Sequence, residues 1–409
     1  MNNFSEFPIS DYLKERLHSA RFTIPTPVQA AAIPQALEGK DVLATAQTGT
    51  GKTLAFLVPA IEMLLQQETA GIAALVLVPT RELAMQVVEQ FNALRGKKLS
   101  PAALVIGGVS EGQQLSALRK GARLVVATPG RLEDFLSRKL VQFRDLRILV
   151  LDESDRMLDM GFLPAIRRIV GVLPAQRQTM CFSATLEASV AHLVHDYLRN
   201  PVRLAFGSTL KPSENVRLQA FEVVAGRKQD LLRHLLAKET GRCLVFSRTK
   251  RGAERLARSL VRDGFAAAMI HGDRSQSQRT AALAGFQQGR YRVLVATDLA
   301  SRGIHVQGIA HVINYDLPEV AESLIHRVGR TGRAGGHGVA SILFSREQRT
   351  ELFQLERTLG IRMERMPVDG KLPEKMEQIR SGYDRLESTS LSTLVPLPGE
   401  VLQGRMAAD

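Results

Sequence analysis

The sequence predicts an α/β protein with two domains, each a mainly parallel sheet flanked by helices. Short apolar, β-branched runs alternate with helix-type patterns, and the alternation is interrupted once, by a polar segment at residues 207–214. Continuous apolar strands between helices are typical of parallel sheets that are covered on both faces. The length of 409 residues agrees with two domains of roughly 100–200 residues each.

The apolar runs fall into two groups, and the polar segment between the groups carries Gly and Pro without helix or strand periodicity. We therefore predict domains at residues 1–206 and 215–367, a linker at 207–214 and a short C-terminal extension at 368–409. The runs expected to be strands are 41–46, 73–78, 103–106, 124–127, 148–151 and 179–182 in the first domain, and 243–246, 267–270, 293–296, 312–315 and 339–344 in the second.

Composition excludes several classes of protein. No apolar run approaches the roughly 20 residues that cross a membrane, and the N-terminus lacks a signal-peptide pattern. The two cysteines, Cys181 and Cys243, lie in apolar runs, so we expect buried free thiols rather than disulfides or a metal site. These features suit a cytoplasmic protein without membrane contact.

The net charge of +13 favours a polyanionic partner. Charge alone does not separate nucleic-acid binding from lipid binding. Trp is absent and aromatic residues make up only 5% of the chain. Binding through phosphates is therefore favoured over stacking of bases on aromatic side chains.

A glycine-rich turn lies between the first apolar run and a helical pattern, which is the context of a phosphate-binding loop. Gly49 and Gly51 let backbone amides approach phosphate oxygens, Lys52 supplies a cation, and Thr53 offers a hydroxyl to Mg²⁺. The alternative is a chance Gly-Lys-Thr in an ordinary turn, and the strict motif has Gly at the first position. The residues expected to bind ATP are Ala46, Gln47, Thr48, Gly49, Thr50, Gly51, Lys52 and Thr53.

Acidic residues follow the apolar run at 148–151. Asp152 at a strand end can hold Mg²⁺, and Glu153 can orient and deprotonate the attacking water. The alternative is a solvated acidic turn in which Asp155 caps the next helix. An acidic turn directly after a buried strand and downstream of a phosphate loop favours the catalytic interpretation.

The tetrad Asp152-Glu153-Ser154-Asp155 resembles the signature of the DEAD-box ATP-dependent RNA helicases, with Ser154 in place of the usual Ala. The resemblance extends from Phe4 to about Phe344, with the motifs in the family's order. It implies a bacterial-type minimal core of two tandem RecA-like domains that uses ATP and Mg²⁺. It also implies RNA-stimulated ATP hydrolysis coupled to domain closure, strand bending and local unwinding of RNA duplexes, or remodelling of RNA–protein complexes.

Further motifs complete the ATP site by this resemblance. Residues 22–29 resemble the family's Q motif, so Phe22 and Gln29 are expected at the adenine. Hydroxyls of the motif Ser183-Ala184-Thr185 are expected to hydrogen-bond Asp155 and, together with His326, to couple ATP state to the rest of the protein.

Residues 326–333 resemble the family's sixth motif, in which Arg330 and Arg333 would reach the γ-phosphate as arginine fingers. The alternative is a basic surface cluster. His305 stands where the family usually has an Asp that meets the ribose. We expect His305 to change ATP affinity or its pH dependence, and an unchanged pH profile in His305→Asp would contradict this.

The remaining motifs suit contacts with an RNA backbone. Each motif alone is more typical of a turn or a helix cap. Their joint occurrence at the ends of several expected strands favours contacts with RNA. The predicted binding is salt-sensitive and largely independent of base order. The candidates are Arg81, Gly108, Thr128 and Arg131 in the first domain, and Thr249, Arg279 and Thr297 in the second.

Two other functions remain open at this point. A non-catalytic RNA clamp could retain the fold, although Lys52, Asp152 and Glu153 are all present. A DNA translocase could share most motifs, although the Gln29 motif favours RNA. The protein is expected to be a monomer, and partners from ribosome assembly or RNA decay are both compatible with the sequence.

Overall fold

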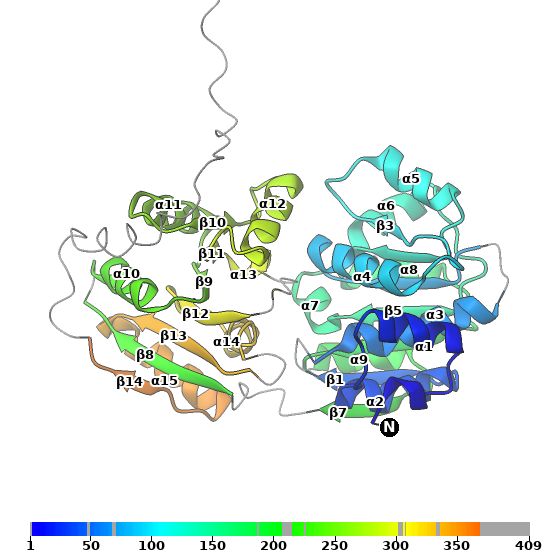
Figure 1. Ribbon diagram of the computed structural model, residues 1–409, viewed down its shortest axis with the longest axis horizontal. Coiled ribbons are helices and arrows are strands. Elements are labelled where there is room, and N and C mark those ends of the chain that lie inside the picture. The colour runs from blue at the N-terminus through cyan, green and yellow to red at the C-terminus, as the bar shows by residue number, and fades with distance from the viewer. Residues whose placement is uncertain are drawn as a thin grey trace, which may run out of the picture. The chain divides into compact units, whose positions relative to one another are not determined.

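The structure is a computed structural model that describes residues 2–46, 50–67, 71–185, 188–206, 215–224, 226–301, 306, 308–332 and 336–368. Two seven-stranded parallel sheets with flanking helices dominate these residues (Figure 1). This confirms the predicted fold class of two tandem RecA-like units.

The first lobe, as we call the elements from η1 to β7, begins with helices and then alternates strands and helices. Its elements are η1 (Phe4–Glu6), α1 (Asp11–Ser19), α2 (Pro27–Leu37), β1 (Val42–Ala46), α3 (Lys52–Gln66), β2 (Ala74–Leu77), α4 (Arg81–Leu94), β3 (Ala103–Val105), α5 (Glu111–Arg119), β4 (Leu124–Ala127), α6 (Pro129–Ser137), β5 (Ile148–Asp152), α7 (Ser154–Asp159), α8 (Leu163–Gly171), β6 (Gln178–Ser183), α9 (Ala188–Tyr197) and β7 (Val202–Phe206).

The second lobe, from β8 to β14, repeats the alternation. Its elements are β8 (Val216–Glu222), α10 (Lys228–Lys238), β9 (Arg242–Phe246), α11 (Lys250–Arg262), β10 (Ala267–Ile270), α12 (Gln276–Gln287), β11 (Val293–Ala296), α13 (Asp298–Ser301), β12 (Ile309–Asn314), α14 (Ala321–Val328), β13 (Gly338–Phe344), η2 (Arg346–Gln348), α15 (Arg349–Leu359) and β14 (Glu364–Met366).

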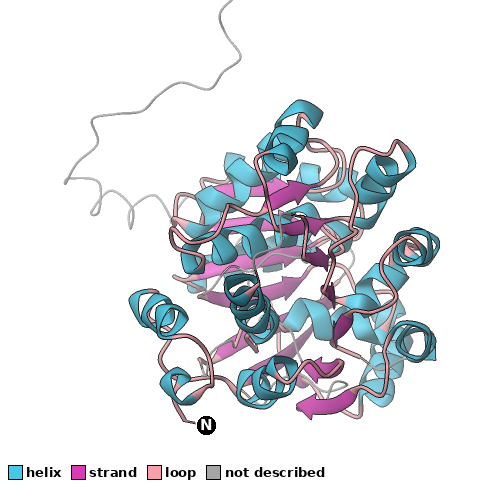
Figure 2. Cartoon of the chain, turned by 90° about the vertical axis from the view of Figure 1, so that its right-hand side faces the viewer, coloured by secondary structure: helices cyan, strands magenta, loops and turns pink. Residues whose placement is uncertain are grey.

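The central strands are buried on both faces because their side chains alternate between two apolar clusters. In β5, Val150 belongs to one cluster of the first lobe, while Leu149 and Leu151 belong to the other. Helices accordingly lie on both sides of the strands (Figure 2). This explains why each of these strands is a continuous apolar run in the sequence.

The two sheets have the same strand order. The first is β3-β4-β2-β5-β6-β1-β7 and the second is β10-β11-β9-β12-β13-β8-β14. All the strand pairs are parallel, so the carboxyl ends of the strands meet at one edge of each sheet. Ligands of open α/β sheets bind outside that edge.

Three strands, β7, β8 and β14, were not predicted. β7 and β14 are the outermost strands at one end of their sheets and are partly exposed, so they lack a continuous apolar run. β8 carries polar residues among its apolar ones. The predicted linker and residues 369–409 lie outside the described residues, so the domain boundaries stay predictions.

Two smaller expectations concern the apolar segments. Both cysteines are buried free thiols, and burial raises the pKa of each to about 12. Within the described part of the chain, no helix is long and apolar enough to cross a bilayer.

Candidate active site

The turn between β1 and α3 carries the predicted phosphate loop, of which Gln47, Thr48 and Gly49 lie outside the described residues. Lys52, the first residue of α3, is 6% exposed, and its Nζ donates to the carbonyl of Ala46 at 2.8 Å. Ala46 thus ends β1 within reach of the lysine that begins the helix. Thr50 and Thr53 are half-buried.

Gln29 ties α2 to this loop. Its Oε1 accepts from the backbone amide of Thr26 at 2.9 Å, and its Nε2 donates to the carbonyl of Gly51 at 2.9 Å. Gly51 has a φ of +90°, and a Cβ there would lie 2.4 Å from Nε2 of Gln29. Glycine is therefore required at this position for both backbone conformation and space. Phe22 is half-buried and packs against the apolar cluster of the first lobe that contains Val150.

The carboxyl end of β5 places Asp152 beside the loop. Asp152 is 3% exposed, and burial raises the pKa of its carboxyl to about 7, with Lys52 opposing the shift. The hydroxyl of Thr53 and the carboxylate of Asp152 are hard oxygen donors, which Mg²⁺ prefers. A cation here would also stabilise the charged form of Asp152, which burial otherwise disfavours.

Glu153 has a left-handed backbone with φ 52° and ψ 49°, an uncommon conformation for a residue other than glycine. Its amide donates to Oδ1 of Asp152 at 3.0 Å. Its Oε2 forms a buried ion pair with Arg156 at 2.9 Å, and both side chains are nearly inaccessible. Sequence analysis missed Arg156, although its spacing of three residues on a helix would have suggested the pair.

Asp155 joins the end of β5 to the end of β6. Its Oδ2 accepts from the amides of Ala184 and Thr185 at 2.9 and 3.0 Å, and from the Thr185 hydroxyl at 3.3 Å. The Thr185 hydroxyl thus makes the bond expected from the Ser-Ala-Thr motif. The Ser183 hydroxyl, also expected to bond Asp155, does not: it is buried, and no described residue hydrogen-bonds it.

Ser154, which replaces the family's Ala, is fully buried. Its hydroxyl donates to the carbonyl of Phe182 at 3.4 Å and accepts from the Cys181 thiol at 3.3 Å. The extra hydroxyl is therefore satisfied on the neighbouring strand, away from the carboxylates of Asp152 and Glu153.

In the second lobe, Arg327 lies in the last turn of α14, and the predicted Arg330 follows the end of the helix. Arg327 is 2% exposed, and its guanidinium forms a bidentate pair with Asp298 at 2.6 Å. It also donates to Oδ1 of Asn314 at 3.1 Å and to the carbonyl of Asp316 at 2.7 Å. Sequence analysis gave Arg327 no separate role, and the structure gives it four hydrogen bonds to buried or partly buried groups of the second lobe.

The other residues expected at the nucleotide or in coupling lie on both sides of Arg327 in the chain. Arg330 is buried at 2% exposure, and His326 is half-buried. Arg333 and His305 lie outside the described residues, so their assignments stay predictions.

Four candidate RNA contacts lie after β2, β3 and β4 of the first lobe. The Arg81 guanidinium lies over the Gly107-Gly108 backbone so closely that a Cβ at Gly108 would be 2.4 Å from it. Thr128 is the buried N-cap residue of α6. Arg131 pairs with Asp134 at 2.6 Å and with Glu111 at 3.0 Å, so its cation is already partly neutralised.

The second-lobe candidates follow β9, β10 and β11. Thr249 caps α11, because its hydroxyl accepts from the amide of Gly252 at 3.0 Å. Thr297 follows β11 and is buried. Arg279 pairs with Glu82 at 3.0 Å, and Gln276 donates to the same carboxylate at 3.0 Å. Sequence analysis missed Glu82. Its position directly after Arg81, at the start of the same helix, was a signal that could have found it.

The common strand order separates these residues into two groups. The candidates for ATP follow β5, β6 and β1, which are neighbours in the first sheet. The candidates for RNA follow β3, β4 and β2, and β10, β11 and β9, which are neighbours at one end of each sheet. The strand order thus places the candidates for ATP beside the candidates for RNA.

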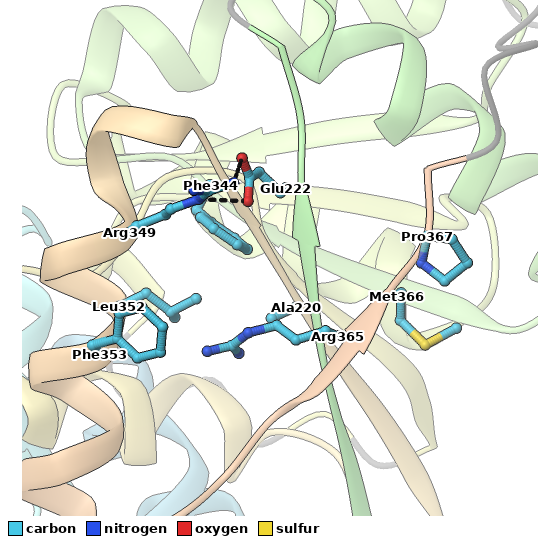
Figure 3. A pocket seen from close by; sticks show the side chains of 9 residues that line it. All are labelled: Ala220, Glu222, Phe344, Arg349, Leu352, Phe353, Arg365, Met366 and Pro367. Atoms are coloured by element: carbon cyan, nitrogen blue, oxygen red, sulfur yellow. Dashed lines mark hydrogen bonds and ion pairs between the residues drawn. The ribbon is translucent and has the colours of Figure 1, made fainter.

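A well-formed cavity of about 460 Å³ lies elsewhere, between α15, β8 and β14 (Figure 3). Its lining includes Phe344, Phe353 and Met366, with the Glu222–Arg349 ion pair at its rim. It contains none of the predicted site residues, so we do not assign it to ATP or RNA.

Comparison with known proteins agrees with this geometry. The DEAD/DEAH box helicase family matches residues 26–193, and the helicase conserved C-terminal domain matches residues 227–335. The DEAD-box ATP-dependent RNA helicase CshA of Bacillus subtilis is 38% identical over 388 residues, which are 94% of this chain and 78% of that protein. The chain belongs to the DEAD-box ATP-dependent RNA helicases.

Other members of the family give the same picture. CshA of Geobacillus kaustophilus is 37% identical over 97% of this chain and 84% of its own length. Among solved structures, S. cerevisiae Dbp5 bound to RNA and ADP BeF3 has a TM-score of 0.82 with 30% identity, covering 90% of this chain and 96% of that one. As a DEAD-box RNA helicase, the protein is an enzyme that hydrolyses ATP and binds RNA.

Proposed function

We propose that the first lobe binds ATP with Mg²⁺, and that approach of the second lobe, favoured by RNA, completes the hydrolytic site. The observation that carries this proposal is the arrangement of three buried residues at one sheet edge: Lys52 begins α3, Asp152 ends β5 and Glu153 follows it as the N-cap of α7. Buried charges of both signs at such an edge are costly unless a charged ligand compensates them.

Each residue of the first lobe has a distinct task in this proposal. Lys52 stabilises the β- and γ-phosphates, while Thr53 and Asp152 hold Mg²⁺, which when bound offsets charge on the phosphate oxygens. Glu153 accepts a proton from the attacking water. Arg156 fixes the direction of the Glu153 carboxylate through their buried ion pair. The backbone of the loop, residues 46–53, surrounds the phosphates.

Gln29 has capacity left for adenine. Its amide uses one N–H and one lone pair within the protein, so one N–H and one lone pair remain for the base. Because the same side chain bonds Gly51, adenine binding would also fix the end of the phosphate loop. Phe22 would pack beside the base.

The second lobe contributes cations. Arg330 and Arg333 stabilise charge that develops on the γ-phosphate, and His305 meets the ribose. Arg327 positions this segment through Asp298 and Asn314. The Asp155–Thr185 bond and His326 pass the state of the nucleotide to the RNA-binding side.

The RNA would lie along the carboxyl ends of β3, β4 and β2 in the first sheet and of β10, β11 and β9 in the second. The protein would contact its phosphates and sugars. Arg81, Gly108, Thr128 and Arg131 would contact it in the first lobe. Bending of this strand as the lobes approach would unwind short duplexes locally or remodel RNA–protein complexes. Dbp5 was solved with RNA and a nucleotide analogue, which supports a joint RNA and nucleotide state. We infer a monomer acting in the cytoplasm, with domains at residues 1–206 and 215–367.

The decisive variant is Glu153→Gln, which keeps size and polarity but cannot accept the proton. We expect kcat for ATP hydrolysis to fall by at least about 10²-fold while ATP binding persists. The exposed Glu89→Gln is the matched control and should hydrolyse ATP like the parent. Equal rates in parent and Glu153→Gln would remove Glu153 as the base.

The nucleic acid is tested by comparing ATPase stimulation by single-stranded RNA and DNA of equal length and sequence. RNA should stimulate hydrolysis and DNA should not. Stimulation by both alike would favour a DNA translocase, and stimulation by neither would favour a clamp without coupled catalysis.

A further inference from the structure

Helix α11 carries a straight row of arginines on its outer face. Arg251, Arg255, Arg258 and Arg262 follow one another at intervals of four, three and four residues, and all are exposed. This spacing keeps the side chains on one face of a helix. At a rise of 1.5 Å per residue, the row spans about 16 Å. We call these residues the arginine row.

Most of the row is unneutralised. Glu254 is the one acidic residue of the helix, and it pairs with Arg258 at 2.6 Å. No described residue forms an ion pair with Arg251, Arg255 or Arg262. By contrast, Arg227 and Arg233 near the neighbouring α10 pair with Asp230 at 2.6 and 3.1 Å.

The row therefore does little for the fold. Like charges at intervals of four residues destabilise a helix by a few tenths of a kcal/mol per pair. The apolar face of α11, including Leu256 and Leu260, is buried and holds the helix in place without help from the arginines. A surface that costs stability in the free protein is best explained by a polyanionic ligand.

The row borders a groove of about 700 Å³ that is lined by residues of α11 and β10. β10 is an edge strand of the second sheet and lies beside α11 (Figure 1). Ala257, Ala267 and Met269 contribute apolar surface to its lining, and the lining contains no aromatic residue. The groove therefore offers arginines without an aromatic platform for bases, which suits contacts to phosphates and sugars.

The position of the row selects RNA over an acidic protein. α11 begins immediately after Thr249, one of the proposed RNA contacts, and Arg251 lies two residues further on. The row is thus continuous with the proposed RNA-binding edge. Arginine also forms bidentate hydrogen bonds with phosphate that lysine cannot form.

We propose that the arginine row is a second RNA-binding surface, which holds the phosphate backbone of RNA that extends beyond the strand on the sheet edge. The proposal rests on the proposed function, because it needs an RNA anchored at Thr249 and its neighbours. Its effect is to favour long or structured RNAs over short ones without reading their sequence.

The test uses two RNAs and a double variant, Arg255→Gln/Arg262→Gln. The short RNA is the shortest single strand that fully stimulates ATP hydrolysis by the parent. The long RNA is the same strand extended by a duplex arm, placed at either end in turn. Glutamine is a good helix former, so α11 should persist. The double variant Arg290→Gln/Arg362→Gln removes the same charge from exposed positions of the second lobe and serves as the control.

We expect the row variant to lose on the order of tenfold in affinity for the long RNA in one arm orientation. The slope of log affinity against log salt should become shallower by about 1.4–1.8, for two lost phosphate contacts. Affinity for the short RNA and its maximal ATPase rate should stay at parental values, and the control should match the parent throughout.

Three results would overturn the proposal. Unchanged affinity for the long RNA in both orientations would remove the row from RNA binding. Equal losses for short and long RNA, or equal losses in the control, would show a general effect of net charge. Tighter row-dependent binding of a peptide of alternating Glu and Leu than of the long RNA would assign the groove to an acidic protein. If no RNA stimulates the parent, the proposed function itself fails first.

Discussion

The two lobes share one strand order but place different chemistry at equivalent points. In the first sheet the helix after β1 starts with Lys52, which follows a glycine-rich turn and donates to Ala46. In the second sheet the helix after the equivalent strand, β8, starts with Lys228, which donates to the carbonyl of Tyr315 at 3.3 Å. The preceding turn in the second lobe lacks a Gly-Lys-Thr sequence.

The central strands differ in the same way. β5 ends in Asp152, followed by Glu153, whereas its equivalent β12 ends in Asn314, followed by Tyr315 and Asp316. Arg327 bonds both the Asn314 side chain and the Asp316 carbonyl. The comparison teaches that the same frame begins the helix after β1 and the helix after β8 with a lysine. Only the first lobe combines this lysine with a Gly-Thr-Gly-Lys-Thr turn and with an Asp-Glu pair at the carboxyl end of the central strand β5.

The two lysines give the sharpest test of this difference. Lys52→Gln should lower kcat/KM for ATP by about 10²–10³-fold, because a cation that stabilises the phosphates is lost. Lys228→Gln should change it less than about threefold, since substitutions away from a site act mainly on stability. Steady-state ATPase assays with saturating RNA measure both. Similar losses in the two variants would mean that the lobes share the nucleotide more evenly than their sequences indicate.

Arg327 tests what the second lobe uses its buried charge for. Arg327→Gln leaves Asp298 and Asn314 without their cation, and breaking such a buried pair costs about 3–5 kcal/mol. The cost should lie near the lower limit because Asp298 is 33% exposed. Urea unfolding followed by circular dichroism measures it.

The exposed ion pair between Arg349 and Glu222 provides the control. Arg349→Gln should lower the free energy of unfolding far less than Arg327→Gln does, because exposed pairs are screened by water. Equal free energies of unfolding for the two variants would show that Arg327 serves the nucleotide rather than the fold.

Local sequence was sufficient for much of this site. The turn at Lys52 and the acidic tetrad at Asp152 lie directly between a strand and a helix, so each motif carries its own structural context. The bond between Asp155 and Thr185 was also expected, although only the family resemblance suggested it. The contact between Gln29 and Gly51 was not expected. Twenty-two residues separate them, and both the Gln29 amide and the Gly51 carbonyl have many alternative partners.

Pattern analysis missed other features for physical reasons. The edge strands β7 and β14 need no continuous apolar run, because solvent covers part of each. The equivalent positions of Lys228 and Lys52 could not be predicted from the sequence, because the equivalence depends on strand order and not on a motif. Ser154 was expected to have little effect, and the structure supplies a reason in its hydrogen bonds to Phe182 and Cys181.

A smaller difference between the lobes concerns pH, through His311 in β12. His311 is 5% exposed, and its Nε2 hydrogen-bonds the Ser341 hydroxyl at 2.8 Å. Burial lowers the pKa of its imidazole to about 4, with Glu239 opposing the shift. Between about pH 6.5 and about pH 4, this histidine is protonated in the unfolded chain but neutral in the folded protein. The stability of the second lobe should therefore be complete near neutral pH and fall as the pH drops through this window.

The expected loss is at most about 3–4 kcal/mol, because the pKa falls from 6.5 to about 4 and each pKa unit is worth about 1.4 kcal/mol. Asp152 has the opposite sign: its raised pKa means that the first lobe loses stability as the pH rises from about 4 to about 7.

Urea unfolding of the parent and of His311→Gln at several pH values separates the effect of His311 from that of Asp152. The variant should lack the acid-side loss, while the exposed His195→Gln should retain it. If His311→Gln and the parent lose the same free energy between pH 6.5 and 4, His311 is protonated in the folded protein and the lobes do not differ in this respect.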